Sequence, residues 1–151
     1  MLQHLSTHTD EKNRKEGAEE RRALIGKAGG VEALTEAMER HPSVAKLLKY
    51  AFVVLRNLCV DNDDNRRRVA QAGGVEVVVK AMNNHPSAEL LLEQACAVLQ
   101  NLSTHTEKRN RKLCEDRRAL IGKAGGVEAV TKAMQKASIR REAVEIRLWG
   151  A

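Results

Sequence analysis

The chain has 151 residues, of which 42% are hydrophobic and 30% are charged, and its formal net charge is +6. This composition is typical of a globular protein and excludes a mostly disordered chain. No apolar run approaches the ~20 residues of a membrane-spanning helix, and no signal-peptide pattern opens the chain. Only 2% of the residues are aromatic, which disfavours a β-sandwich or barrel, so we expect an all-helical fold.

The chain is built from an internal repeat. The decapeptide LIGKAGGVEA occurs at residues 24–33 and again at 120–129, and VAQAGGVEVV at 69–78 is a weaker copy. Aligned on their Ala-Gly-Gly sequences, the copies begin 44 and 52 residues apart. Residues further along match as well: HPS at 41–43 and 85–87, LRNL at 55–58 with LQNL at 99–102, and LQHLSTHT at 2–9 with LQNLSTHT at 99–106. Such a period indicates a stack of repeated structural units.

Each unit is predicted to begin with two short helices. In the second unit the first helix covers roughly Arg66 to Ala72, and Asn65 is a good residue to cap its N-terminus. Gly73 ends this helix, because glycine readily adopts the left-handed conformation found at helix C-termini. The second helix then runs from roughly Val75 to Asn83.

A longer third helix follows the HPS sequence and ends at Leu102. Its apolar residues recur at i, i+3, i+4 and i+7, which predicts one buried face. One unit alone cannot bury such a face, so the units are expected to stack into a solenoid. The predicted buried residues are Leu91, Leu92, Ala95, Val98, Leu99 and Leu102 in the second unit, and Leu47, Leu48, Ala51, Val54, Leu55 and Leu58 in the first.

The second unit resembles an armadillo repeat. The resemblance rests on NRRRVAQAGGVEVVVKAM at residues 65–82 and ACAVLQNLS at 95–103, which give a short helix, a Gly-Gly kink, a second helix and a long third helix ending in Asn-Leu. HEAT repeats, the nearest alternative, lack the glycine kink. The resemblance covers essentially the whole chain, and it implies an all-α fold, a right-handed α-solenoid of three-helix repeats that forms a single domain.

Two full units and partial units at both ends make up the predicted domain. A stub at residues 2–9 matches the end of a third helix, unit one covers roughly 20–59, unit two roughly 63–103 and a partial unit three roughly 115–149. Charged inserts at about 9–20 and 104–115 either lengthen the connections between units or extend the first helices. The ends are compatible with a piece of a longer array, with a truncated chain, or with a protein that caps itself by association.

The resemblance also implies a binding surface. In armadillo proteins the third helices line a concave groove, where a recurrent Asn bonds the backbone of an extended peptide. Asn57 and Asn101 match that position, with His4 as a degenerate equivalent, although both Asn residues are equally suited to cap the helix or bond the next loop. The residues that share their faces are Lys46, Lys49, Tyr50 and Val53 on the first unit and Glu93, Gln94 and Ala97 on the second.

The excess of basic residues leaves several kinds of partner open. A basic surface binds acidic proteins or phosphate backbones, but the scarcity of aromatic side chains disfavours recognition of single-stranded bases. Alternatively, the basic residues form a solvated face with local acidic partners, and those at 108–112 also resemble a nuclear-localisation signal. The Trp that nuclear-import receptors carry four residues before the Asn is replaced by Val53 and Ala97, so binding of a classical import signal is not expected.

No pattern of catalytic or metal-binding residues is found in the sequence. Cys59 and Cys96 lie in apolar helical runs and are expected to behave as small hydrophobic residues, whereas Cys114 is the candidate reactive thiol. The three cysteines form neither a disulfide framework nor a zinc-binding spacing, which favours a cytoplasmic or nuclear location. We therefore expect no enzyme activity, cofactor, metal or small-molecule substrate.

The sequence thus predicts a scaffold that binds a protein or peptide partner, including an acidic one, in a groove lined by the third helices. The alternative function is structural self-assembly through open repeat ends, which would give a homo-oligomer. A weaker alternative is binding to nucleic acid or an anionic surface, which would depend steeply on salt.

Overall fold

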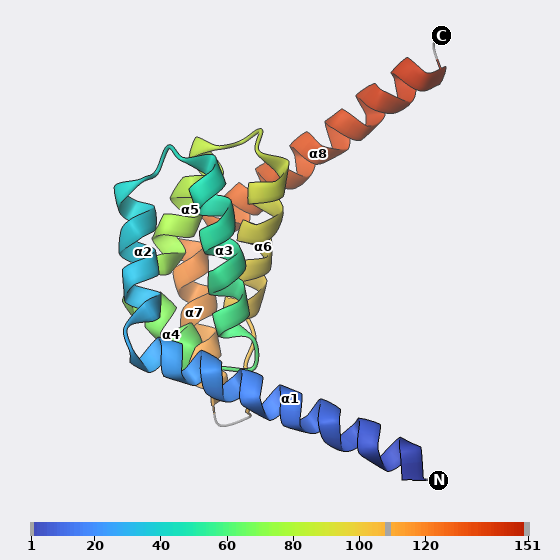
Figure 1. Cartoon of the computed structure of the whole chain (residues 1–151). Helices are drawn as coiled ribbons and strands as arrows, with labels where there is room; N and C mark the ends of the chain where they lie inside the picture. The colour runs from blue at the N-terminus through green and yellow to red at the C-terminus, as the bar shows by residue number, and fades with distance from the viewer. Residues whose placement is uncertain (1, 108–109, 150–151) are drawn as a thin grey trace.

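A computed structural model describes residues 2–107 and 110–149 of the chain, with side chains over 13–107 and 110–137. The described residues form eight α-helices and no strand, which confirms the all-α prediction (Figure 1). The helices are α1 (Leu2–Lys27), α2 (Gly30–Arg40), α3 (Ala45–Cys59), α4 (Asp63–Gln71), α5 (Gly74–Asn84), α6 (Glu89–Leu102), α7 (Arg111–Lys123) and α8 (Gly126–Trp149).

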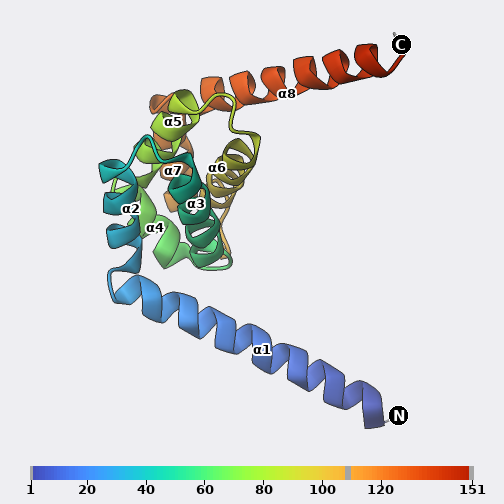
Figure 2. The same ribbon diagram turned by 45° about the horizontal axis from the view of Figure 1, so that its top comes forward.

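The helices lie in three rows that run through the stack. Helix α4 contacts both α1 and α7, helix α5 contacts both α2 and α8, and α3 lies beside α6. Each row therefore contains helices that the repeat alignment makes equivalent. The N-terminal part of α1 and the C-terminal part of α8 project away from this body (Figure 2).

The repeated Gly-Gly pair serves two different purposes. The first glycine, at positions 29, 73 and 125, has a φ of 83, 75 and 79°, respectively, and directly precedes α2, α5 or α8. This left-handed conformation is costly for any residue with a side chain. The second glycine has no room for one: a Cβ at Gly74 would lie 2.6 Å from Val69 Cγ1 and 2.9 Å from the Val69 carbonyl oxygen. The pair thus sets the sharp angle between the first two helices of each unit.

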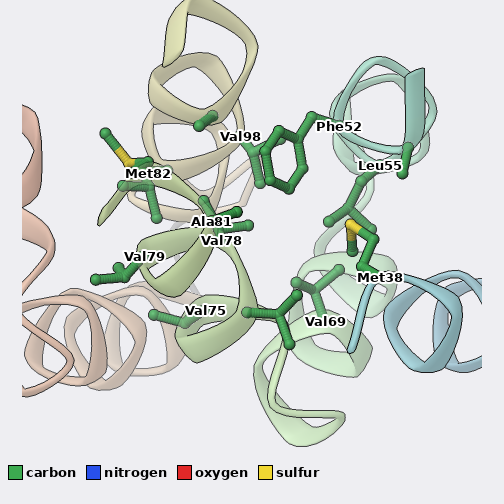
Figure 3. Close-up of a cluster of buried hydrophobic side chains, with 14 of the residues drawn as sticks. Met38, Phe52, Leu55, Val69, Val75, Val78, Val79, Ala81, Met82 and Val98 are labelled. Carbon is green, nitrogen blue, oxygen red and sulfur yellow. The ribbon is translucent and has the colours of Figure 1, made fainter. Parts of the chain in front are cut away.

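The core lies where successive units meet. Phe52 is fully buried between α3 and α6 and faces Val98, while Met38 lies beside Leu55 and Val69 (Figure 3). Burying one such side chain contributes about 1.5–3 kcal/mol to stability. The predicted buried face of α6 is confirmed at all six positions.

The prediction for the equivalent face of α3 was wrong at Val54, which is 47% exposed, and Leu47 is only half-buried. Val98, the counterpart of Val54 on α6, is covered because α3 lies beside it. The other contacts of α3 within the described chain are with α1, α2 and α4, and they leave Val54 exposed.

The cap of α4 also differs from the prediction. Asn62 rather than Asn65 caps the helix, since Asn62 Oδ1 accepts a hydrogen bond from the Asn65 backbone N–H at 2.9 Å. Asp63 and Asp64 then fill the first turn, where the helix dipole stabilises acidic side chains. Asn65 is left inside the helix and is buried.

Both long helices differ from the predicted three-helix pattern. The third unit was expected to break before a separate third helix, but α8 is continuous, because Ala137-Ser138-Ile139 replaces the HPS sequence and no proline interrupts the helix. Helix α1 likewise runs unbroken through the predicted stub and first insert. The second insert both lengthens the connection after α6 and supplies the first turn of α7, which starts at Arg111.

Candidate functional site

The nine residues predicted to bind a partner lie on α3 and α6, which are adjacent along their length (Figures 1 and 2). None of them is buried, so none belongs to the hydrophobic core. The exposed residues are Lys46, Tyr50, Asn57 and Glu93, and the half-buried ones are Lys49, Val53, Gln94, Ala97 and Asn101.

One end of this surface combines an aromatic ring with positive charge. Tyr50 is 54% exposed, and Lys49 Nζ lies 4.4 Å from the centre of its ring. A cation over an aromatic face is a stabilising contact that also holds the ring in place. Next to Lys49, a shallow hollow of about 320 Å³ lies between the N-terminal parts of α3 and α6, with the exposed Leu90 on its α6 side.

The other end holds the two asparagines, which the structure places in different surroundings. Asn101 Nδ2 donates a hydrogen bond to the Arg56 carbonyl oxygen at 3.0 Å and so ties α6 to α3. Within residues 13–107 and 110–137, the side chain of Asn57 has no such partner and is exposed.

A second tie between the two helices involves Arg56, which the sequence analysis did not single out. Arg56 Nη1 donates to Gln94 Oε1 at 3.1 Å, so Gln94 is also partly engaged inside the protein. The sequence offered one signal, because Arg56 directly precedes Asn57 in the LRNL sequence and a long basic side chain there can reach a neighbouring third helix. Arg56, Gln94 and Asn101 therefore fix the relative positions of α3 and α6.

A polar cluster around Asp63 was also missed. Its carboxylate accepts hydrogen bonds from Arg66 Nη1 at 2.7 Å, from the Thr106 N–H at 3.0 Å and from Asn110 Nδ2 at 2.8 Å. Burial raises the pKa of Asp63, but these hydrogen bonds outweigh it, so the pKa of this carboxyl is lowered overall. The cluster fastens the connection after α6 to the start of α4.

Arg117 completes the polar cluster from the side of α7. Its Nε donates to the Leu102 carbonyl oxygen at 2.8 Å and its Nη2 donates to the Thr104 carbonyl oxygen at 2.7 Å. The same guanidinium lies 3.5 Å from Asp63. Arg117 thus interacts with backbone carbonyl groups and with the Asp63 carboxylate. This cluster therefore holds successive units together and is not a candidate binding or catalytic site.

The cysteines are structural residues. The prediction that Cys114 is a reactive thiol was wrong, since Cys114 is buried in α7 and its Sγ donates to the Ser103 carbonyl oxygen at 3.1 Å. Cys59 is buried as expected, and burial raises the pKa of its thiol to about 12. Cys96 is half-buried, and burial raises its pKa as well.

Several of the basic side chains are paired with acids. Arg67 contacts Asp64 at 2.7 Å, Arg68 contacts Glu32 at 3.2 Å, and Arg111 contacts Glu115 at 3.1 Å. Residues 108 and 109 of the basic sequence lie outside the described residues, and so do the side chains of His4 and Trp149. The histidines of the two HPS turns follow α2 and α5, and His85 Nε2 lies 2.7 Å from the Pro42 carbonyl oxygen.

The described residues lack two further features. They contain no group of three His, Cys, Asp or Glu side chains placed to hold a metal ion. Over the same part of the chain, no helix is both long enough and apolar enough to cross a membrane.

These observations define an all-α repeat protein in which equivalent helices of successive units lie side by side. Residues 62–104, which contain α4, α5 and α6, match the family model of the Armadillo/beta-catenin-like repeat. The chain therefore carries an armadillo repeat, which implies an α-solenoid, and armadillo repeats are in general non-catalytic modules that scaffold protein interactions. Comparison with curated proteins and with solved structures gave no match.

Proposed function

We propose that this chain binds an extended segment of a partner protein across the surface formed by α3 and α6. The observation that carries the proposal is the juxtaposition of these helices with nine exposed or half-buried side chains of mixed chemistry. An armadillo repeat at 62–104 supports a protein partner in general. The assignment of these particular residues is our inference.

The amide of Asn57 is suited to hold a peptide backbone. An asparagine side chain donates and accepts at once, so it can pair with both the N–H and the C=O of a peptide group. The amide of Asn57 is exposed, and the described residues satisfy neither of its groups. Asn101 has a different role in this proposal, because its Nδ2 is committed to the Arg56 carbonyl and only its oxygen is left to accept from the partner.

The opposite end favours side-chain recognition. Lys46 and Lys49 line the α3 side of the hollow, and Glu89 lies on the α6 side. A partner segment with acidic residues towards α3 and an apolar residue against Tyr50 and Leu90 would complement this pattern. The partner is thus a peptide segment of mixed character with acidic residues.

The organisation of the chain and its location are part of the same proposal. We infer one domain whose units span roughly 20–59, 63–103 and 115–149, acting without catalysis or cofactor in the cytoplasm or nucleus. Free thiols at Cys59, Cys96 and Cys114 support a reducing compartment.

Selection from a displayed library of random 12-residue peptides tests the proposed α3–α6 surface directly. The selected peptide is then titrated against the full chain and against three variants, Tyr50→Ala, Asn57→Ala and Gln71→Ala. Tyr50→Ala and Asn57→Ala should each weaken binding at least tenfold, while Gln71→Ala, on the exposed end of α4, should leave it unchanged. Equal binding by all three variants would place the peptide elsewhere and contradict the proposal.

A further inference from the structure

The C-terminal end of the stack exposes residues whose counterparts are buried inside it. Val127 and Met134 on α8 are 64% and 68% exposed, whereas Val31 and Met38, at the same places on α2, are 0% and 1% exposed. Met38 is covered by its own third helix and by Val69 of the next unit (Figure 3). The α7–α8 end therefore exposes positions that are buried between units elsewhere in the chain.

The other half of such an interface can be read inside the chain, where α4 packs against α1. Asn65 Nδ2 donates to the Arg22 carbonyl oxygen on α1 and to the Leu58 carbonyl oxygen, both at 2.9 Å. The amide reaches α1 only because Gly26 has no side chain: a Cβ there would lie 1.8 Å from Asn65 Oδ1. A buried amide that satisfies backbone carbonyls makes this contact selective for a short polar side chain.

A salt bridge between α4 and α2 accompanies this contact. The residues that α1 and α2 contribute to both interactions occur again on α7 and α8. Arg68 Nη1 lies 3.2 Å from Glu32 Oε1. Because residues 21–33 and 117–129 are identical, Arg118, Gly122 and Glu128 stand on α7 and α8 where Arg22, Gly26 and Glu32 stand on α1 and α2. A Cβ at Gly122 would meet no atom of the described chain within 4 Å.

The interface between the second and third units is of another type. On α4 the position of Gly26 is held by Ala70, and on α7 the positions of Asn65 and Arg68 are held by Arg117 and Leu120. Arg117 bonds the carbonyls at the end of α6 instead of a first helix. A first helix with glycine at this position, such as α1, thus packs against a helix with Asn-x-x-Arg, such as α4. The helix with Arg-x-x-Leu, α7, packs instead against α4, which has alanine at this position.

We propose that α7 and α8 form a docking face for an armadillo-type repeat of a partner protein whose first helix carries Asn-x-x-Arg, as α4 does. A second copy of this chain stacked head to tail would present Arg21 and Leu24 at those two places. The long Arg21 side chain has no room where the short amide fits, and Leu24 cannot pair with Glu128. The docking face is separate from the proposed peptide-binding surface on α3 and α6 and does not depend on it.

A full-length donor variant supplies the required helix for the test. In the donor, the substitutions Arg21→Asn and Leu24→Arg, both at exposed positions of α1, place Asn-x-x-Arg on the first helix of the stack. A third substitution, Gly122→Leu, blocks the donor's own α7–α8 face. The donor is mixed with the wild-type chain over a range of concentrations in sedimentation velocity experiments. We expect a one-to-one complex of twice the 16.7 kDa chain mass. Far-UV circular dichroism of each protein establishes that all variants remain folded.

Two matched controls decide the outcome. The wild-type acceptor is replaced by Gly122→Leu, whose new side chain stands where the amide must approach, and this should abolish the complex. Restoring Arg21 in the donor should weaken it at least tenfold. Failure of the wild type to bind the donor, or equal binding by the Gly122→Leu acceptor, would overturn the proposal. Dimers of the wild type alone that Gly122→Leu abolishes would assign the face to a second copy instead.

Discussion

The Asn65 amide lies directly against Gly26 where α4 packs on α1: a Cβ at Gly26 would be 1.8 Å from Asn65 Oδ1. The amide is held there by two carbonyl acceptors and cannot swing away without losing both. Gly122 occupies the same place in an identical decapeptide, but a Cβ added there would meet no atom of a neighbouring described helix within 4 Å. Replacing each of the two glycines by alanine therefore separates the effect of helix propensity on stability from the effect of packing.

The substitutions Gly26→Ala and Gly122→Ala should change stability in opposite directions. Gly122→Ala should stabilise the chain by about 0.5–1 kcal/mol, because alanine is the better helix former and the space is open. Gly26→Ala should destabilise it by about 1–3 kcal/mol, since the new methyl group displaces the Asn65 amide. Urea denaturation followed by circular dichroism measures both. Equal effects would show that α4 does not press on α1 at this point.

Asp63 should be far more important for stability than its neighbour Asp64. The Asp63 side chain is 10% exposed and lies against Arg66 and Arg117, whereas that of Asp64 is 73% exposed beside Arg67. Asp63→Ala leaves two buried guanidinium groups without their carboxylate and should cost about 3–5 kcal/mol. Asp64→Ala should cost at most about 1 kcal/mol by urea denaturation, as expected for an exposed pair in a first helical turn. A similar loss for the two variants would contradict the clustered geometry.

The same carboxylate predicts the acid sensitivity of the fold. The pKa of Asp63 is lowered in the folded chain by its hydrogen bonds, so its stabilising effect is fully present above 3.8, the usual pKa of an aspartate side chain, and is lost as the pH falls through the lower, folded value. The free energy of unfolding of the wild type should therefore decrease as the pH falls below about 4. In Asp63→Asn this part of the decrease should be missing. A parallel decrease in both proteins would assign the acid sensitivity to other carboxyl groups.

The sequence was informative where a single residue type sets a local geometry. Gly73 was correctly predicted to take the left-handed conformation, because no other residue tolerates it as well. The buried face of α6 was predicted from spacing, because α6 is covered on the side that its apolar residues define. Each of these features is determined within one unit.

The sequence failed where the environment is provided by a distant segment. Val54 and Val98 occupy the same position in two repeats, and only the presence of α3 beside α6 makes one buried and the other exposed. Cys114 was predicted to be the candidate reactive thiol, yet it is buried where one face of α7 packs against the end of α6. The contacts of Asp63 with Thr106 and Asn110 join residues more than 40 positions apart, and no local pattern marks them.

The thiols should react in the order of their exposure. Cys96 is half-buried, whereas Cys59 and Cys114 are buried, and a high thiol pKa further slows Cys59. Under native conditions a chromogenic disulfide reagent should modify Cys96 first, and only unfolding in urea should release the other two. Cys96→Ala is the matched control and should remove the fast phase. Rapid reaction of Cys114 in that variant would contradict its position in the structure.

The two asparagines of the proposed groove should separate binding from folding. Asn57→Ala should change stability by less than about 0.5 kcal/mol, as is usual for an exposed position, while Asn101→Ala loses a hydrogen bond to the Arg56 carbonyl and should cost about 1 kcal/mol. Binding of a groove-selected peptide should depend more strongly on Asn57, because its amide offers both a donor and an acceptor. Urea denaturation and peptide titration on the same preparations provide both readouts. If Asn57→Ala lost stability and binding together, Asn57 would be a helix-capping residue. If it lost neither, the side chain that binds the peptide backbone would have to lie elsewhere on α3 and α6.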